Sequence, residues 1–167
     1  MHIPFNILEN LSRACIFRLM KLTLQTDYAL RALIYLGVRT EGLCSIRQIA
    51  QAYGVSEGHM IKVIHRLGMG GFIETIRGRN GGVRLGRAPE TIMIGAVVRY
   101  MEEDLSLLAC MEPGGENRPD LCALMPGCRL RGVLSQAMGA MLGVLDQYTL
   151  ADVITPHERQ RLAEKAE

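Results

Sequence analysis

The sequence predicts a mainly α-helical chain with a small β-hairpin, followed by one long helix. Apolar residues recur at steps of three and four through several segments between residues 26 and 148, which is the period of amphipathic helices. Two short β-prone runs joined by a glycine-rich stretch interrupt this pattern near residue 80. The chain has 167 residues, 49% of them hydrophobic, which is enough to close a core without disulfides.

Charge is divided unevenly along the chain. Residues 20–90 carry ten lysines and arginines against five acidic residues, whereas residues 91–167 carry seven against eleven. A basic first half is suited to binding a polyanion. No apolar run approaches the roughly 20 residues that span a bilayer, so we expect a cytoplasmic protein without a membrane partner.

Short helices around a tight turn are expected in the basic half. A first helix begins near Thr26 or Asp27, either of which can cap it, and a second helix follows Ser45. The turn Gly54-Val55-Ser56 then leads into a helix over residues 57–67 with one apolar and one basic face. This arrangement is typical of a helix-turn-helix that lays its second helix in the major groove, although an ordinary pair of packed helices has the same spacing.

A hairpin follows, and it is interpreted as a wing. The β-prone runs 72–76 and 83–85 flank a tip where the pair Asn80-Gly81 is expected to supply positive φ angles. Arg77 and Arg79 at the tip suit the narrow minor groove of A/T-rich DNA, whereas a solvated surface hairpin is the simpler alternative. The expected DNA contacts are Ser56, Glu57, His59, Lys62, Arg66, Arg77, Arg79 and Asn80.

The sequence of the second half of the chain predicts a connecting helix over about 94–101 and a long helix after residue 128. Apolar residues of the long helix alternate at steps of four and three, as in the seam of a coiled coil. Such a seam packs either on its own chain or on a second copy, and we favour a homodimer because a palindromic operator requires two recognition helices. The seam consists of Leu130, Leu134, Ala137, Met141, Val144 and Tyr148.

Three of the five cysteines, Cys110, Cys122 and Cys128, share a loop rich in proline and glycine. Three thiolates are soft ligands, which suit an iron–sulfur cluster or an incomplete zinc site, and exposed thiols also suit redox sensing. Cys15 and Cys44 are not candidates, since Cys15 lies in an N-terminal extension and Cys44 reads as a small buried residue. A thiol redox enzyme is the weakest alternative because no Cys-x-x-Cys motif is present.

Three segments together resemble the Rrf2 family of winged-helix regulators, over about residues 20–154. They are Leu22-Thr23-x-x-Thr26-Asp27-Tyr28-Ala29-Leu30-Arg31, Arg77-Gly78-Arg79-Asn80-Gly81-Gly82 and Cys128-Arg129-Leu130. The likeness is greatest to the nitric-oxide-sensing repressors of the family. It implies a dimeric DNA-binding repressor, not an enzyme, that reads a palindromic, A/T-rich operator.

The resemblance also implies a [4Fe-4S] or [2Fe-2S] cluster on Cys110, Cys122 and Cys128, completed by Asp27 of the partner subunit. The plain alternative for Asp27 is an acid placed favourably at a helix N-terminus. The gap between Cys110 and Cys122 is longer than is usual in the family, which leaves the loop conformation open. An iron- or oxidant-responsive regulator of the same family is the main alternative function.

The predicted architecture is therefore a winged helix-turn-helix plus a long dimerisation helix. Its parts are an N-terminal extension (1–19) that is disordered or precedes the native start, a DNA-binding region (20–90), a connecting helix (91–109), a cluster-binding loop (110–128), a dimerisation helix (129–154) and a C-terminal tail (155–167).

Overall fold

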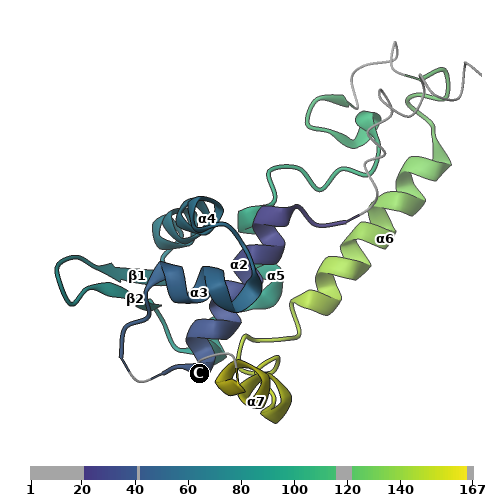
Figure 1. Ribbon diagram of the computed structural model, residues 1–167. Coiled ribbons are helices and arrows are strands. Elements are labelled where there is room, and N and C mark those ends of the chain that lie inside the picture. The colour runs from purple at the N-terminus through teal and green to yellow at the C-terminus, as the bar shows by residue number, and fades with distance from the viewer. Residues whose placement is uncertain (1–20, 41, 116–121, 165–167) are drawn as a thin grey trace, which may run out of the picture.

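The computed structural model describes residues 21–40, 42–115 and 122–164; the predicted extension and Cys15 lie outside them. Figure 1 shows a compact body of helices with a protruding hairpin, and one long helix that leaves the body as an arm. The fold is mainly α with a two-stranded sheet, as predicted. In chain order the elements are α2 (Leu24–Val38), α3 (Ile46–Tyr53), α4 (Glu57–Met69), β1 (Ile73–Ile76), β2 (Gly82–Leu85), the 3-10 turn η1 (Pro89–Thr91), α5 (Ile94–Met101), the 3-10 turn η2 (Ala109–Met111), α6 (Arg129–Leu145) and α7 (Pro156–Glu164).

Helix α2 begins before the predicted caps. Thr23 has extended backbone angles, and its hydroxyl accepts a hydrogen bond from the backbone N–H of Thr26 at 3.3 Å. Thr26 lies inside the helix and is fully buried, so its side chain is part of the core. The expectation of Thr26 or Asp27 as the cap was therefore wrong, because Thr23 offers the same hydroxyl one turn earlier.

The cap of α3 is the one expected from the sequence, and the predicted turn residue Ser56 is the cap of α4. Ser45 accepts from the backbone N–H of Gln48, and the Gln48 side chain accepts from the Ser45 N–H at 2.8 Å, which completes a capping box. Gly54 ends α3 in the left-handed region with a φ of 63°, a conformation that favours glycine. Ser56 then caps α4 by accepting from the His59 N–H at 3.3 Å. These local bonds fix the turn between the two helices.

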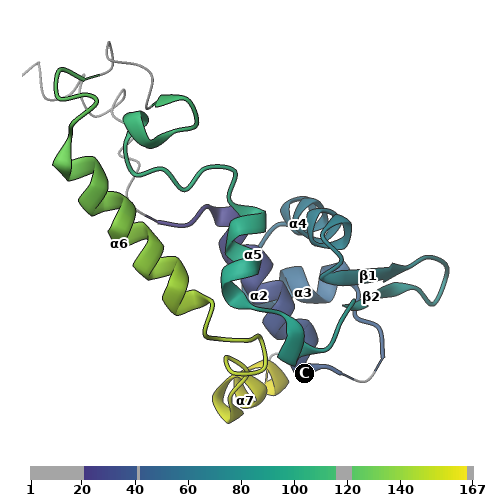
Figure 2. The same cartoon turned by 180° about the vertical axis from the view of Figure 1, so that it is seen from behind.

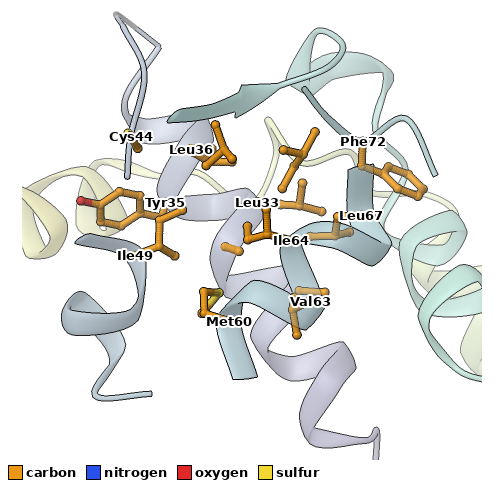
Figure 3. Close-up of a cluster of buried hydrophobic side chains, with 14 of the residues drawn as sticks. Leu33, Tyr35, Leu36, Cys44, Ile49, Met60, Val63, Ile64, Leu67 and Phe72 are labelled. Atoms are coloured by element: carbon orange, nitrogen blue, oxygen red, sulfur yellow. The ribbon is translucent and has the colours of Figure 1, made fainter. Parts of the chain in front are cut away.

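One apolar core joins the helices of the body. Figure 3 shows Leu33 on α2 next to Ile64 on α4, with Ile49 on α3 beside Tyr35, and all of them are almost fully buried. The buried face of α4 consists of Met60, Val63, Ile64 and Leu67, which is the predicted apolar face. Such burial of apolar area is the main source of stability in a domain of this size, and it orients the opposite face of α4 toward solvent.

Strands β1 and β2 pair antiparallel, with Ile76 opposite Gly82, and form the wing. The turn chemistry differs from the prediction, because the positive φ of the tip belongs to Gly78, at 117°, and not to Asn80-Gly81. Gly81 is needed for a different reason: a Cβ there would collide with the carbonyl oxygen of Ile76. Five residues, 77–81, connect the strands, against the six that the predicted strand bounds left between them.

The arm is shorter than predicted. Helix α6 ends at Leu145, and Arg99 on α5 holds the next residue, Asp146, through two hydrogen bonds of 2.5 and 2.6 Å. Beyond Asp146 the chain turns back, and Thr149 forms a β-bridge with Met93. Tyr148 therefore lies outside the helix, and the seam ends at Val144.

The predicted tail contains a helix. Thr155 precedes α7, its backbone N–H donates to the Glu158 carboxylate at 3.0 Å, and its hydroxyl contacts the same carboxylate. Leu162 is buried in the core, and its carbonyl accepts from Arg39 at 3.3 Å. The pattern Thr-x-x-Glu at residues 155–158 is the sequence signal for the start of this helix.

Candidate DNA interface and cysteine site

The outward face of α4 carries the first group of predicted DNA contacts. Ser56 and Glu57 stand at the N-terminus of the helix, and His59 and Lys62 follow within two turns; all four are exposed. In a helix-turn-helix the N-terminal residues of this helix face the base edges. All four side chains are therefore accessible around the N-terminal half of α4.

Arg66 is placed differently from the other expected contacts. Its guanidinium donates to the carbonyl of Tyr100 at 3.1 Å and lies 3.5 Å from the Glu103 carboxylate, while the Tyr100 hydroxyl donates back to the Arg66 carbonyl at 2.9 Å. Arg66 therefore braces α4 against the end of α5. Sequence periodicity puts it on the basic face, but a partner 34 residues away uses its donors.

The wing carries the second group. Arg77, Arg79 and Asn80 are exposed at its tip, and among the described residues neither arginine forms an ion pair. Arg84 on β2 is instead paired across the sheet with Glu74 at 2.8 Å. On the wing, the positive charge that is available to a ligand therefore lies at the tip.

Figure 2 shows the wing projecting from the same body that carries α4. Helix α4 packs directly on β1, so the outward face of α4 and the wing tip belong to one rigid unit. The fold therefore fixes the outward face of α4 relative to the wing tip.

The three candidate cluster ligands lie around the start of α6. Cys110 is in η2, which contacts α6; Cys122 precedes a turn; and Cys128 is the N-terminal cap of α6, where its side chain forms no capping hydrogen bond. All three are free thiols and half-buried. In Figure 1, η2 and the start of α6 lie at the same far end of the arm.

The loop around Cys110 has a defined local structure. Ser106 donates to the Met111 carbonyl at 3.0 Å, and a Cβ on Gly115 would lie only 2.9 Å from the carbonyl oxygen of Cys110. Only glycine permits this close approach. The three thiols are not gathered, however: within residues 21–40, 42–115 and 122–164 no group of three His, Cys, Asp or Glu side chains is arranged to hold a metal. The donor types fit an iron–sulfur cluster, whose iron prefers thiolate sulfur.

Asp27 stands in the first turn of α2. One carboxylate oxygen, Oδ1, accepts from Nε of Arg31 at 2.8 Å, and this pair is partly exposed. No described residue donates to the other oxygen, which is free to accept a ligand. Cys44, in contrast, is buried beside the wing, as expected for a structural cysteine, and burial raises the pKa of its thiol.

The predicted seam of α6 lies largely open. Leu130 and Val144 are more than half exposed, Met141 and Ala137 are exposed, and Leu134 is half-buried. No residue of α6 is buried by the parts of the chain that the structure describes. The alternative that the seam packs on its own core finds no support there.

A basic recognition helix in a helix-turn-helix, next to a cationic hairpin, defines a winged helix-turn-helix regulator of transcription. The chain belongs to the Rrf2 family, described as iron-dependent transcriptional regulators, whose profile matches residues 22–156. The curated relatives are named as regulators and not as enzymes, so the redox-enzyme alternative has no support. No helix in the described part of the chain has the length and apolarity to cross a membrane.

Similar proteins cover nearly the whole chain. The HTH-type transcriptional regulator NsrR of Bacillus licheniformis is 50% identical over 143 residues, which is 85% of this chain and 97% of that protein. NsrR of Geobacillus kaustophilus is 51% identical over 136 residues, 81% of this chain and 90% of the relative. Among solved structures, IscR of T. potens is 25% identical with a TM-score of 0.62 and 88% of each chain covered. A putative transcriptional regulator of Listeria innocua is 30% identical with a TM-score of 0.65, covering 80% of this chain and 85% of the other.

Proposed function

We propose that this chain is a cytoplasmic, homodimeric repressor whose grip on its operator depends on an iron–sulfur cluster and is released by nitric oxide. The observation that carries the proposal is the meeting, at one end of α6, of free thiols and an uncovered apolar helix face. The identity of about half of the aligned residues with NsrR proteins supports the choice of signal.

Cys110, Cys122 and Cys128 would hold the cluster, and Asp27 of the partner subunit would complete it. When bound, such a cluster supplies iron that nitric oxide attacks. Arg31 orients the Asp27 carboxylate through one oxygen and leaves the other open, which suits a ligand that must reach across to another subunit.

The dimer is proposed from the seam of α6. Packing against the same helix of a second copy would remove Leu130, Met141 and Val144 from water. A two-fold symmetric pair also presents two copies of α4, one for each half of a palindromic operator.

On DNA, each α4 would enter the major groove with His59 and Lys62 foremost, and each wing would place Arg77 and Arg79 in the minor groove of an A/T-rich site. Ser56, Glu57 and Asn80 stand at the rims of these contacts. Arg66 would act indirectly, by fixing the orientation of α4 on α5.

An anaerobic preparation tests the proposal. The protein is expected to be brown, and nitric oxide is expected both to bleach its visible absorption and to abolish its gel shift on the operator. Cys122→Ala should lose colour and specific binding yet remain a folded dimer, while the matched control Cys44→Ala keeps its colour. A colourless protein loaded with zinc, or a coloured Cys122→Ala variant, contradicts the assignment.

A second candidate is an iron- or oxidant-responsive regulator, which is favoured by the description of the family as iron-dependent. It uses the same thiols, and the difference lies in the signal. Release of the operator by an iron chelator or hydrogen peroxide, with no response to nitric oxide, would establish this second function and exclude the first.

A further inference from the structure

Helix α4 exposes one large apolar residue, Ile61, in its N-terminal half, next to the candidate DNA contacts. Ile61 keeps 48% of its surface accessible, whereas its neighbours Met60, Val63 and Ile64 are buried. Isolated exposed apolar residues are common on proteins. The position of Ile61 is unusual because its side of the helix carries polar residues and glycine.

The surroundings of Ile61 leave it open to a ligand. Gly58 precedes it by three residues, so it lies on the same side of the helix, and a Cβ at Gly58 would meet nothing within 4 Å. Lys62 is adjacent, and His65 follows one turn later; both are exposed. Gly58 therefore leaves the side of Ile61 toward the N-terminal half of α4 uncovered, while Glu57 and His65, four residues before and after Ile61, flank it on the same face.

The helix gains nothing from isoleucine at this position on its own account. A β-branched residue forms helix less readily than alanine, lysine or glutamate, and an exposed one adds little core packing to compensate. A contact with a ligand outside the chain would give this apolar side chain a role that helix propensity does not.

We propose that Ile61 determines operator specificity by packing against the 5-methyl group of a thymine in the major groove. This inference rests on the proposed function, in which α4 enters that groove. Thymine alone among the four bases presents a methyl group there, and apolar side chains distinguish it by contact. Lys62, next along the helix, is placed to reach a phosphate and to fix the register of α4. The missing side chain at Gly58 lets the backbone approach the groove floor.

The test begins with selection of the operator from a randomised DNA duplex by the anaerobically purified full-length protein. Each thymine of the selected site is then replaced by uracil, which removes only the methyl group, and binding is measured by fluorescence anisotropy. For wild type, one thymine in each half-site should be sensitive, with a loss of about fourfold per half-site, the worth of one buried methyl group. Ile61→Ala should bind the thymine and uracil duplexes equally.

Met69→Ala is the matched control, because Met69 is an exposed apolar residue on the last turn of the same helix. It should keep the full sensitivity to uracil, and circular dichroism should show both variants folded. Sensitivity to uracil that persists in Ile61→Ala, or its absence in wild type bound to a selected site, overturns the thymine contact alone. A wild type that binds every duplex equally overturns the proposed function as well.

Discussion

The carboxylate of Glu102 accepts a hydrogen bond from the backbone N–H of Thr23 at 2.7 Å, across 79 positions of the chain. Glu102 is buried just after α5, and Thr23 caps α2. The bond satisfies an N–H group at the start of a helix and places a negative charge at its positive end. It therefore ties the segment that leads to the cysteine loop to the helix that carries Asp27.

Removing this bond should destabilise the fold. Glu102→Ala leaves the Thr23 N–H without an acceptor, and urea unfolding should show a loss of about 2 kcal/mol. Glu102→Gln keeps an acceptor oxygen and should lose less. The neighbouring Glu103, which is exposed and 3.5 Å from Arg66, provides the control, since Glu103→Ala should cost about 0.5 kcal/mol or less. Equal losses in the two alanine variants would argue against a special role for Glu102.

The wing should be sensitive to a single methyl group at its tip. Gly81→Ala forces a Cβ against the Ile76 carbonyl, so the turn must rearrange and carry Arg77 and Arg79 away from their positions. Operator affinity in a gel shift should fall by about tenfold, as for the loss of one good contact, while the thermal midpoint changes little. Gly68→Ala adds the same group on α4, where the nearest backbone atom is 3.8 Å away, and should leave binding intact.

Asp146 should contribute stability that depends on pH. The hydrogen bonds from Arg99 lower the pKa of Asp146 below its ordinary 3.8. Its contribution is therefore fully present above pH 3.8 and is lost as the pH falls through the lower, folded-state pKa. The difference in free energy of unfolding between wild type and Asp146→Asn should shrink below pH 3.8, and Arg99→Gln should behave like Asp146→Asn. A difference that is constant to pH 2 would refute the pairing.

Helix α7 should be a structural part of the body and not a dispensable tail. Leu162→Ala deletes buried atoms and should cost about 2–4 kcal/mol in urea unfolding. Gln160→Ala, at an exposed position of the same helix, should change stability by less than about 0.5 kcal/mol. If the two variants unfold alike, the packing of α7 on α2 does not contribute to stability.

A charge introduced into the seam should dissociate the proposed dimer and, with it, abolish the colour of the protein. Met141→Glu would bury two carboxylates in each dimer and should raise the dissociation constant by at least about a hundredfold in analytical ultracentrifugation. The monomer should be colourless, because Asp27 must come from a partner. Gln136→Glu, on an exposed position outside the seam, should remain dimeric and brown. A brown monomer would mean that the fourth ligand is not from the partner.

Signals confined to a few residues predicted the fold well. Ser45 and Ser56 mark the starts of α3 and α4. Each side chain accepts a hydrogen bond from a backbone N–H only three residues later, so the signal is contained in a few neighbouring residues. Thr155 and Glu158 carried the same information for α7, so that helix was predictable in principle. The apolar face of α4 was likewise readable from its period alone.

Features that depend on distant partners could not be predicted. The end of α6 is set by Arg99, 47 residues before Asp146, and nothing near Tyr148 reveals it. The helical period of the sequence places Arg66 on the basic face of α4, yet its guanidinium donates a hydrogen bond to the carbonyl of Tyr100. For the cysteine site, spacing predicts Cys110, Cys122 and Cys128 as donors, but the path of the loop depends on contacts that spacing does not encode.

The uncovered apolar face of α6 makes the proposed sensing activity depend on the cellular concentration of the protein. A helix of 17 residues has little stability alone in water, and none of these residues is buried by the described chain. On the proposed dimer, ordering of the arm and pairing of subunits become a single equilibrium, so below its dissociation constant the amount of competent sensor rises with the square of the chain concentration. Halving synthesis would then leave about one quarter of the sensor, and the cell would tune its sensitivity through the dose of the protein as well as through the signal.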